Sequence, residues 1–270
     1  MALTRIDWDD LPEQTRAAVE KHTGTVLDAR TVAEGLNSAV ALLLSTDTGD
    51  VFVKGLRRDY PRQWTQDMEW MIGKHLGGVA PRTLWRTEDD PEWDLLGFEA
   101  VASRHATYQP GSSDLALLLT TMRILGTIAC PQVPMKTAEN RWKPYMATPD
   151  DAGLLVGDRL LHTDYNPLNV LIAEDGRGAL LIDWAWPTRG AGWIDPACLI
   201  VRLIADGHTA RQAEHVVASL PAWQGAPAEA VNAFADASTR LWQEIADRDP
   251  VSWTGRMAEA AHEWADHRRT

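Results

Sequence analysis

The chain has 270 residues, and its 45% hydrophobic and 24% charged residues are an ordinary balance for a globular protein with a buried core. Its formal net charge of −12 argues against binding to nucleic acid, because phosphate backbones attract a surplus of lysine and arginine. The two cysteines, Cys130 and Cys198, form no C-x-x-C motif, so neither a disulfide framework nor a zinc site is predicted. No apolar run is long enough to span a bilayer and no secretory signal is visible, so we expect a cytoplasmic protein without membrane contact.

Alternating helix and strand patterns fill the first hundred residues. Asp9 or Asp10 can cap a first helix that ends near Gly24. Runs rich in aliphatic and β-branched residues predict strands at 39–45, 51–54, 83–86 and 95–101. Between the second and third runs, apolar residues recur at helical spacing from 62 to 76, where a glycine pair stops the pattern.

Helical patterns dominate the rest of the chain. A turn ending in Asp114 caps a helix over 115–128, and one hairpin has strands at 170–173 and 179–182. The last helices are expected at 209–219, 228–248 and 252–267. A small β-rich segment followed by a larger helical one predicts an α+β protein of two lobes, and a cleft between lobes is a common ligand site.

The clearest chemistry lies just before and just after the predicted hairpin. Asp164 and Asn169 are five residues apart on one expected loop, and the hairpin returns Asp183 beside Asn169. An amide and a carboxylate that converge in this way can hold magnesium, which prefers hard oxygen ligands. Phosphoryl transfer also needs a carboxylate that orients the attacking hydroxyl, and Asp164 is one short loop away. The segment therefore favours phosphoryl transfer over the alternative of two turn-forming aspartates.

These residues carry a resemblance to a known family. His162-x-Asp164-x-x-x-x-Asn169 resembles the catalytic loop of the protein-kinase superfamily, and Ile182-Asp183-Trp184 resembles the metal-binding triplet of aminoglycoside phosphotransferases. The resemblance implies Asp164 as catalytic base and Asn169 and Asp183 as magnesium ligands. It implies for His162 an architectural hydrogen bond that holds the loop.

The same resemblance covers about residues 24–201 and implies a bilobal protein-kinase-like fold. Residues 1–101 would form the N-terminal nucleotide-binding lobe, ending at the hinge. Residues 102–270 would form the C-terminal helical lobe with the catalytic loop and the acceptor site. The implied cofactors are ATP, with GTP as the alternative nucleotide, and Mg2+.

Two N-terminal residues match the lysine and glutamate of the family. Val51-Phe52-Val53-Lys54 resembles the strand with the phosphate-contacting lysine, and Glu69 on the next helix is the implied ion-pair partner. Asp67 is the weaker choice because it lies on another helical face. The alternative for Lys54 is a lysine solvated at a strand end.

Three further positions complete the resemblance. Gly35 and Ser38 lie where a phosphate-covering loop belongs, although a plain turn fits the single glycine as well. Glu99 and Val101 lie in a hinge-like segment, where their backbone groups would meet the adenine edge. Asp195 matches a position that braces the catalytic loop, and helix capping is its alternative role.

Three functions fit these patterns. The first is ATP-dependent phosphorylation of a hydroxyl on an aminoglycoside or other antibiotic, which would confer resistance. The second is a kinase for an ordinary metabolite such as an amino alcohol or a sugar. The third is a non-catalytic pseudokinase. The joint presence of the catalytic candidates argues against it, namely Lys54, Glu69, Asp164, Asn169 and Asp183. The acceptor's identity and the oligomeric state stay open.

The acceptor is expected to be a small hydroxylated molecule with a positive charge. The resembling family is best known for polyamine-sugar acceptors, and the C-terminal helices are rich in acids that a cleft could use to attract a cation. Most of these acids are expected on solvated helix faces. They are Asp206, Glu214, Glu229, Asp236, Glu244, Asp247, Asp249, Glu259, Glu263 and Asp266. Trp253, Met257, Ala260 and Trp264 share one helical face and are predicted to be core.

Overall fold

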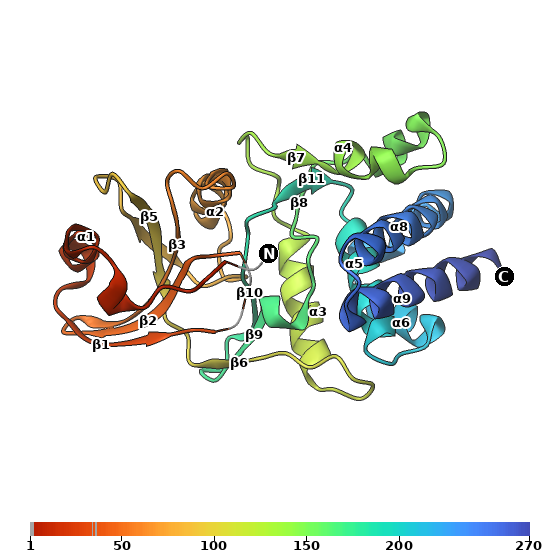
Figure 1. Cartoon of the computed structure of the whole chain (residues 1–270). Coiled ribbons are helices and arrows are strands. Elements are labelled where there is room, and N and C mark those ends of the chain that lie inside the picture. The colour runs from red at the N-terminus through yellow and green to blue at the C-terminus, as the bar shows by residue number, and fades with distance from the viewer. Residues whose placement is uncertain (1–2, 34, 36) are drawn as a thin grey trace.

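The computed structural model describes residues 3–33, 35 and 37–270 (Figure 1). The first helix of the sequence analysis is α1 (Glu13–Thr23), which follows Pro12 and ends at Gly24, whose φ is 74°. Asp9 and Asp10 do not cap it, because they lie in a separate 3-10 turn, η1 (Trp8–Asp10). The proline sets the start of α1 instead, since its fixed φ suits a helix entry and it needs no amide partner.

A five-stranded antiparallel sheet forms the body of the N-terminal half, in the order β1-β2-β3-β5-β4 (Figure 1). Its strands are β1 (Val26–Thr31), β2 (Val40–Thr46), β3 (Gly49–Arg57), β4 (Thr83–Arg86) and β5 (Trp93–Glu99). The predicted strands are confirmed, with β3 extended by several residues at both ends. β1 was not predicted, because it is an edge strand with no buried residue and therefore lacks an apolar pattern. Side chains from β2, β3 and β5 pack with Val19 of α1 as the core of this half.

The helix α2 (Trp64–Gly73) connects the two halves by packing. Its Ile72, together with Leu76 and Val79 beyond its end, belongs to the larger hydrophobic core of the C-terminal half. The amide of Leu181 also donates to the carbonyl of Val79 at 2.7 Å. The carboxyl end of α2 is therefore fixed against the second half of the chain, although it precedes the expected lobe boundary.

The C-terminal half is mainly helical and contains two small sheets, β10-β9-β6 and β7-β11-β8. Their strands are β6 (Ser103–His105), β7 (Lys136–Thr137), β8 (Arg159–Leu161), β9 (Val170–Ala173), β10 (Gly178–Leu181) and β11 (Thr188–Gly190). The helices are α3 (Asp114–Leu125), α4 (Ala138–Trp142), α5 (Ile194–Ala205), α6 (Ala210–Val217), α7 (Pro221–Gln224), α8 (Ala228–Arg248) and α9 (Ser252–Arg269). Short 3-10 turns lie at η2 (Lys143–Tyr145), η3 (Pro149–Leu155) and η4 (Pro167–Asn169).

Figure 1 shows α5, α6, α8 and α9 gathered at the end of the molecule opposite the five-stranded sheet. The small sheets and α3 lie between these helices and the N-terminal half. The predicted α+β arrangement, β-rich first and helical second, is confirmed. Among the described residues, no helix combines the length and the apolar character that a bilayer crossing requires.

Candidate active site

The loop from β8 to β9 and the turn after β10 hold the catalytic candidates. The two loops are tied together, since the amide of Ile182 donates to the carbonyl of Asn169 at 2.9 Å. Thr163 and Asp183 have left-handed φ values of 68° and 63°, which are unfavourable for residues with a Cβ. Such backbone is stable only where the surroundings hold it, and it often occurs at functional sites.

Asp195, at the start of α5, holds the first of these loops. Its carboxylate accepts the amides of His162 at 3.1 Å and of Thr163 at 2.8 Å. Only 4% of Asp195 is exposed, and this burial raises the pKa of its carboxyl group. Arg141 supports the same loop by donating to the hydroxyl of Thr163 at 2.7 Å. The carboxylate therefore braces the loop, as the resemblance implied for Asp195.

The His162 ring is used on both of its nitrogen atoms. Nε2 lies 2.8 Å from the carbonyl oxygen of Ile182, so it donates, and Nδ1 accepts the amide of Asp164 at 3.3 Å. This pattern fits the neutral ring with its proton on Nε2. The ring connects the Asp164 loop to the strand before Asp183, which is the architectural role that the sequence suggested.

The Asp164 side chain points out of this braced loop and is half exposed. Its Oδ2 accepts the amide nitrogen of Asn169 at 3.0 Å. Its Oδ1 accepts Nη2 of Arg202, also at 3.0 Å. A carboxylate offers about four lone-pair positions, so room remains for the hydroxyl of a substrate.

Lys54 lies between two carboxylates from different halves of the chain. Its ammonium nitrogen is 2.9 Å from Oε2 of Glu69 and 2.6 Å from Oδ1 of Asp183. Burial alone would lower the pKa of Lys54, but the two negative charges outweigh it and raise that pKa. For Asp183, burial is likewise outweighed by the Lys54 charge, so its carboxyl pKa is lowered and the group stays ionised. For Glu69, burial dominates and raises the pKa.

Lys54 was expected at the end of a strand, and the structure places it elsewhere. It lies inside β3, opposite Ala41 of β2 and Leu96 of β5, and 13% of its side chain is exposed. Glu69 faces it from α2, and the weaker candidate Asp67 instead pairs with Arg86 at 2.6 Å. The structure therefore joins the lysine to the glutamate that the helical face predicted.

Asn169 and Asp183 present the donors that a magnesium ion prefers. The Asn169 amide nitrogen is turned to Asp164, which directs its oxygen away from that carboxylate. Asp183 accepts Lys54 on Oδ1 and also a hydrogen bond from Asn37, and the carboxylate has about four lone-pair positions, so it can also bind a cation. Among the described residues, no cluster of three His, Cys, Asp or Glu side chains could hold a metal alone. An ion here would need phosphate and water oxygens as well, which is how magnesium is commonly bound in kinase sites.

The expected phosphate-covering loop is described in part, because Glu34 and Leu36 lie outside the described residues. Gly35 has φ 86°, and its carbonyl accepts from Arg5 at 2.9 Å. Ser38 is buried, so its hydroxyl is not presented to a ligand from this loop. The exposed Asn37 lies with Lys54 and Asp183 around a small cavity and hydrogen-bonds to Asp183. Sequence reasoning noted a polar residue there but selected its neighbour.

The hinge candidates lie at the end of β5. The Glu99 amide donates to the carbonyl of Arg82 at 2.9 Å, so it is not available to an adenine edge. The Glu99 carboxylate pairs with Arg177 at 2.9 Å. The Val101 carbonyl accepts the Ser103 hydroxyl at 3.0 Å. Adenine contacts at these residues therefore stay a prediction, and they would use the Glu99 carbonyl and the Val101 amide.

Sequence reasoning missed Arg202 and misplaced Trp253. Arg202 lies on α5, with its guanidinium carbon 5.2 Å from the ring centre of Trp242 and 6.0 Å from that of Trp253. Trp253 is 39% exposed rather than core, and it lies in the first turn of α9. Met257, Ala260 and Trp264 are buried as predicted. The signal for Arg202 was present, since it is the sole basic residue in the apolar run 194–205.

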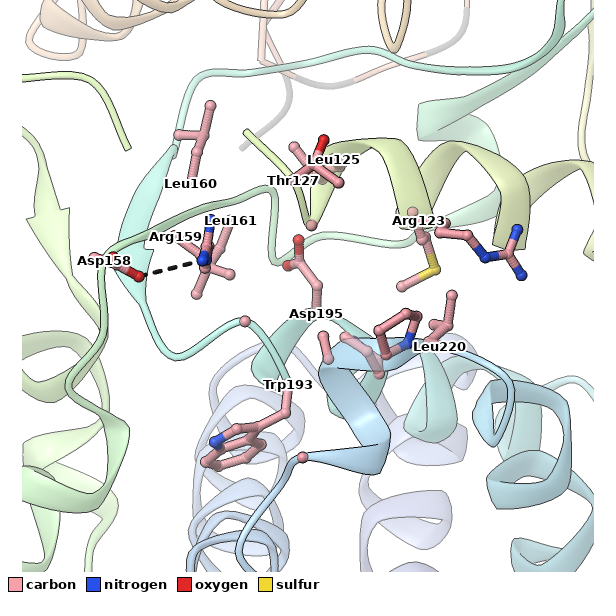
Figure 2. Close-up of a pocket in the computed structure, with 17 residues that line it drawn as sticks. Arg123, Leu125, Thr127, Asp158, Arg159, Leu160, Leu161, Trp193, Asp195 and Leu220 are labelled. Carbon is pink, nitrogen blue, oxygen red and sulfur yellow. Dashed lines mark ion pairs between the residues drawn. The ribbon is translucent and has the colours of Figure 1, made fainter. Parts of the chain in front are cut away.

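A second cavity has Asp195 in its wall, and Lys54 is not among its lining residues (Figure 2). Its volume is about 430 Å³, and its walls come from the end of α3, from β8, from the start of α5 and from 220–225. Figure 2 shows Asp195 among the lining side chains and the pair Asp158–Arg159, whose charged atoms are 3.4 Å apart. None of the residues proposed for phosphate or metal binding lines this cavity.

The comparisons with known proteins concern the fold. No protein-family model and no curated protein matches the sequence. Among solved structures, choline kinase LicA from Streptococcus pneumoniae matches with a TM-score of 0.63 at 13% identity, covering 94% of this chain and 98% of that one.

Two aminoglycoside phosphotransferases match similarly. A thermostable mutant of APH(4)-Ia, in a ternary complex with ADP and hygromycin B, has a TM-score of 0.58 at 14% identity, over 92% of this chain and 97% of that one. The GDP complex of aminoglycoside 2'-phosphotransferase-IIIa has a TM-score of 0.58 at 14% identity, over 94% and 98%. Identities this low establish the architecture alone. The chain has the bilobal, protein-kinase-like fold that choline kinase LicA and these aminoglycoside phosphotransferases share.

Proposed function

We propose that the protein transfers the γ-phosphoryl group of ATP to a hydroxyl group of a small molecule. The observation that carries this proposal is the convergence of Lys54, Glu69 and Asp183 from three separate segments, with the Asp164 carboxylate on the adjoining loop. Burying a lysine with two carboxylates costs desolvation free energy, and only close ion pairs such as these offset that cost. The arrangement supplies a cation for phosphates, a carboxylate for a metal and a half-exposed carboxylate for a hydroxyl.

Each side chain has a defined task in this reaction. Lys54, held by Glu69, would contact the nucleotide phosphates, and Asn169 with Asp183 would hold Mg2+, which neutralises charge on those phosphates. Asp164 would accept the hydrogen bond of the acceptor hydroxyl and align its oxygen with the phosphorus. It would receive the hydroxyl proton as the new O–P bond forms and the bond from the γ-phosphorus to the β–γ bridging oxygen breaks, so that ADP leaves. Positioning and electrostatic stabilisation account for most of the catalysis in phosphoryl transfer.

We propose a hydroxylated, positively charged acceptor such as an aminoglycoside or another antibiotic. The net charge of −12 supports a cation, and so do the acceptors named for the similar folds, choline and hygromycin B. The second candidate is a kinase for a metabolite such as an amino alcohol, which the fold of LicA favours equally. A pseudokinase is disfavoured, because the charged or polar side chains that the reaction needs are all present and in contact with one another: Lys54 pairs with Asp183, and Asn169 donates to Asp164.

A coupled assay of ADP release across a panel of aminoglycosides, amino alcohols and sugars tests the proposal. The key variant is Asp164→Asn, and Asp150→Asn on the exposed turn η3 is the matched control. Loss of a positioned base costs about 10² to 10⁴-fold in kcat, with nucleotide affinity unchanged. ADP release by Asp164→Asn within about threefold of wild type would remove Asp164 from the mechanism. Nucleotide binding without turnover of any acceptor, and without ATP hydrolysis, would favour the pseudokinase.

A further inference from the structure

We propose that Arg202 is a positioning residue for the catalytic carboxylate and that it couples Asp164 to the C-terminal helices α8 and α9. The proposal rests on the base role given to Asp164 above. Arg202 comes from the middle of α5, and its Nη2 donates to Oδ1 of Asp164 at 3.0 Å. The contact adds a charged donor, beside the amide of Asn166, to the carboxylate oxygen that Asn169 does not hold.

The surroundings of Arg202 explain why its guanidinium is fixed. Only 12% of the side chain is exposed, and a charge that has lost most of its water needs a charged or polar partner. The faces of Trp242 on α8 and Trp253 on α9 lie 5.2 and 6.0 Å from its central carbon, at favourable distances for cation–π contacts. The two indoles pack edge to face, with centroids 6.2 Å apart, and Met257 contacts the other Nη atom.

Three hydrogen bonds to Asp164 define the direction in which the carboxylate points. Asn169 holds Oδ2, whereas Arg202 and, at 3.3 Å, the amide of Asn166 hold Oδ1, so rotation of the group about its side-chain bonds would break one or more of these contacts. A base that is held in one orientation loses less entropy when the acceptor hydroxyl is aligned. Charge-assisted hydrogen bonds of this kind are about twice as strong as neutral ones. Arg202 therefore acts on the reaction through Asp164.

The two tryptophans that contact Arg202 come from two different helices. Trp242 lies in the last two turns of α8 and Trp253 in the first turn of α9, so both helices reach Arg202 through these indoles. A molecule that moves either indole would change how Arg202 holds Asp164. The helices at the far end of the molecule in Figure 1 are in this way connected to the catalytic loop.

The test compares Arg202→Met, Arg202→Lys and the exposed control Arg211→Met on α6. Acceptor-free hydrolysis of Mg2+–ATP is the probe, because it needs no identified acceptor. Arg202→Met should lower kcat about 10- to 100-fold, the loss expected when a hydrogen bond to a charged group is removed. The KM for ATP and the unfolding midpoint should stay close to those of Arg211→Met. Arg202→Lys should fall between, because lysine keeps the charge without the planar fork.

Chemical rescue and a mutant cycle separate positioning from simple packing. Millimolar methylguanidinium should restore part of the activity of Arg202→Met, with equal sodium chloride as the control. Trp242→Leu should lower kcat in wild type and have little further effect in Arg202→Met, since the two residues act through one contact. Additive losses would overturn the proposed coupling.

Two outcomes would overturn the proposal, and they differ from failure of the proposed function. Hydrolysis by Arg202→Met within twofold of wild type, while Asp164→Asn is impaired, would show that Arg202 does not position the base. An unrescued loss that parallels a lower unfolding midpoint would show a role in packing alone. Unimpaired hydrolysis by Asp164→Asn would overturn the base assignment itself.

Discussion

The ammonium nitrogen of Lys54 and Oδ1 of Asp183 lie 2.6 Å apart, although 129 residues separate them in the chain. Lys54 belongs to the five-stranded sheet, whereas Asp183 follows the hairpin of the C-terminal half. The pair therefore bridges the two halves beside the small cavity that both side chains line, with Glu69 of α2 as the third member. When a nucleotide and a cation bind, Lys54 would contact the phosphates and Asp183 the cation. The two side chains would then be linked through the ligands instead of directly.

The first prediction concerns Asp183→Ala. The variant should lose the magnesium dependence of ATP binding, because Asn169 alone offers one neutral ligand to a hard divalent cation. Asp175→Ala, in the exposed turn of the same hairpin, is the matched control and should bind as wild type does. Calorimetric titration with ATP, with and without magnesium, measures the effect. If Asp183→Ala keeps its magnesium dependence, the metal is held elsewhere.

The second prediction concerns the stability of Lys54→Met. Removal of the lysine leaves Glu69, which is 5% exposed, without its counter-charge, and breaking such a pair costs about 3 kcal/mol. The pKa of Glu69 is already raised by burial, so its protonated form suits the folded state. The variant should therefore be least destabilised at low pH and lose stability as pH rises through the folded-state pKa of Glu69.

Urea unfolding of Lys54→Met between pH 5 and pH 8 checks this sign. The double variant Lys54→Met/Glu69→Gln serves as the control, because it has no ionisable group at position 69. It should recover most of the lost stability and show a weaker pH dependence. Equal destabilisation of the single and double variants at pH 8 would refute the account, and the lysine would then matter for packing alone.

The sequence predicts those site residues whose relative positions depend only on nearby residues in the chain. Asp164, Asn169 and Asp183 were predicted together because a short loop and a tight hairpin fix their separation. Glu69 was distinguished from Asp67 by helical phase, and the ion pair with Lys54 confirms that choice. These signals need no knowledge of how distant segments pack.

The missed features depend on tertiary packing. Arg202 meets Asp164 only because α5 packs under the catalytic loop, and no spacing rule links residues 38 positions apart. β1 lies at a sheet edge and has half-buried and exposed residues without strict alternation, so its strand character comes from its pairing with β2. The sequence could not show which of Asn37 and Ser38 faces the site, because the exposure of Asn37 and the burial of Ser38 depend on the fold.

The third prediction concerns Asp114, which was expected to cap a helix. Its carboxylate instead accepts both Nη atoms of Arg104, at 2.6 and 2.7 Å, and the amide of Thr107 at 3.0 Å. The hydrogen bonds from Arg104 outweigh burial and lower the pKa of Asp114 to about 2. A lowered pKa stabilises the fold above the ordinary aspartate pKa, and the contribution is lost as pH falls from about 4 to about 2.

Asp114→Asn should therefore cost about 1 to 2 kcal/mol at pH 7, a discounted value because Arg104 is more than half exposed. The cost should shrink as pH falls towards 2. Thermal unfolding of wild type and variant across this pH range measures it. Asp89→Asn, in the exposed turn before β5, is the control and should show no such trend. A cost that is constant from pH 7 to pH 2 would rule out the charge-based explanation.

The acids of the C-terminal helices are mostly used within those helices. Glu214 pairs with Arg268 at 3.2 Å, Asp236 with Arg269 at 2.7 Å, and Glu244 with Arg248. The prediction of solvated helix faces fits Asp236 and Glu244, whose side chains are 41% and 47% exposed, whereas that of Glu214 is 20% exposed. Asp206 is different, because it follows α5 and its charge interacts with that of Arg202. Burial raises the pKa of Asp206, the largest of the influences on it.

The last prediction tests whether charge steers the acceptor. If a cation is drawn to the acid-rich half, kcat/KM for the acceptor should fall as salt rises from about 0.02 to 0.3 M, because the Debye length shrinks through about 10 Å. The KM for ATP should respond less or in the opposite sense, since Lys54 attracts an anion. Asp206→Asn should flatten the acceptor's salt response, whereas the neutralisation of the paired Glu244 in Glu244→Gln should leave it unchanged. A preferred acceptor that is neutral, with kcat/KM independent of salt, would contradict the proposal of a cationic acceptor. It would favour a sugar or another uncharged hydroxyl compound, and phosphoryl transfer by Asp164 would be unaffected by that result.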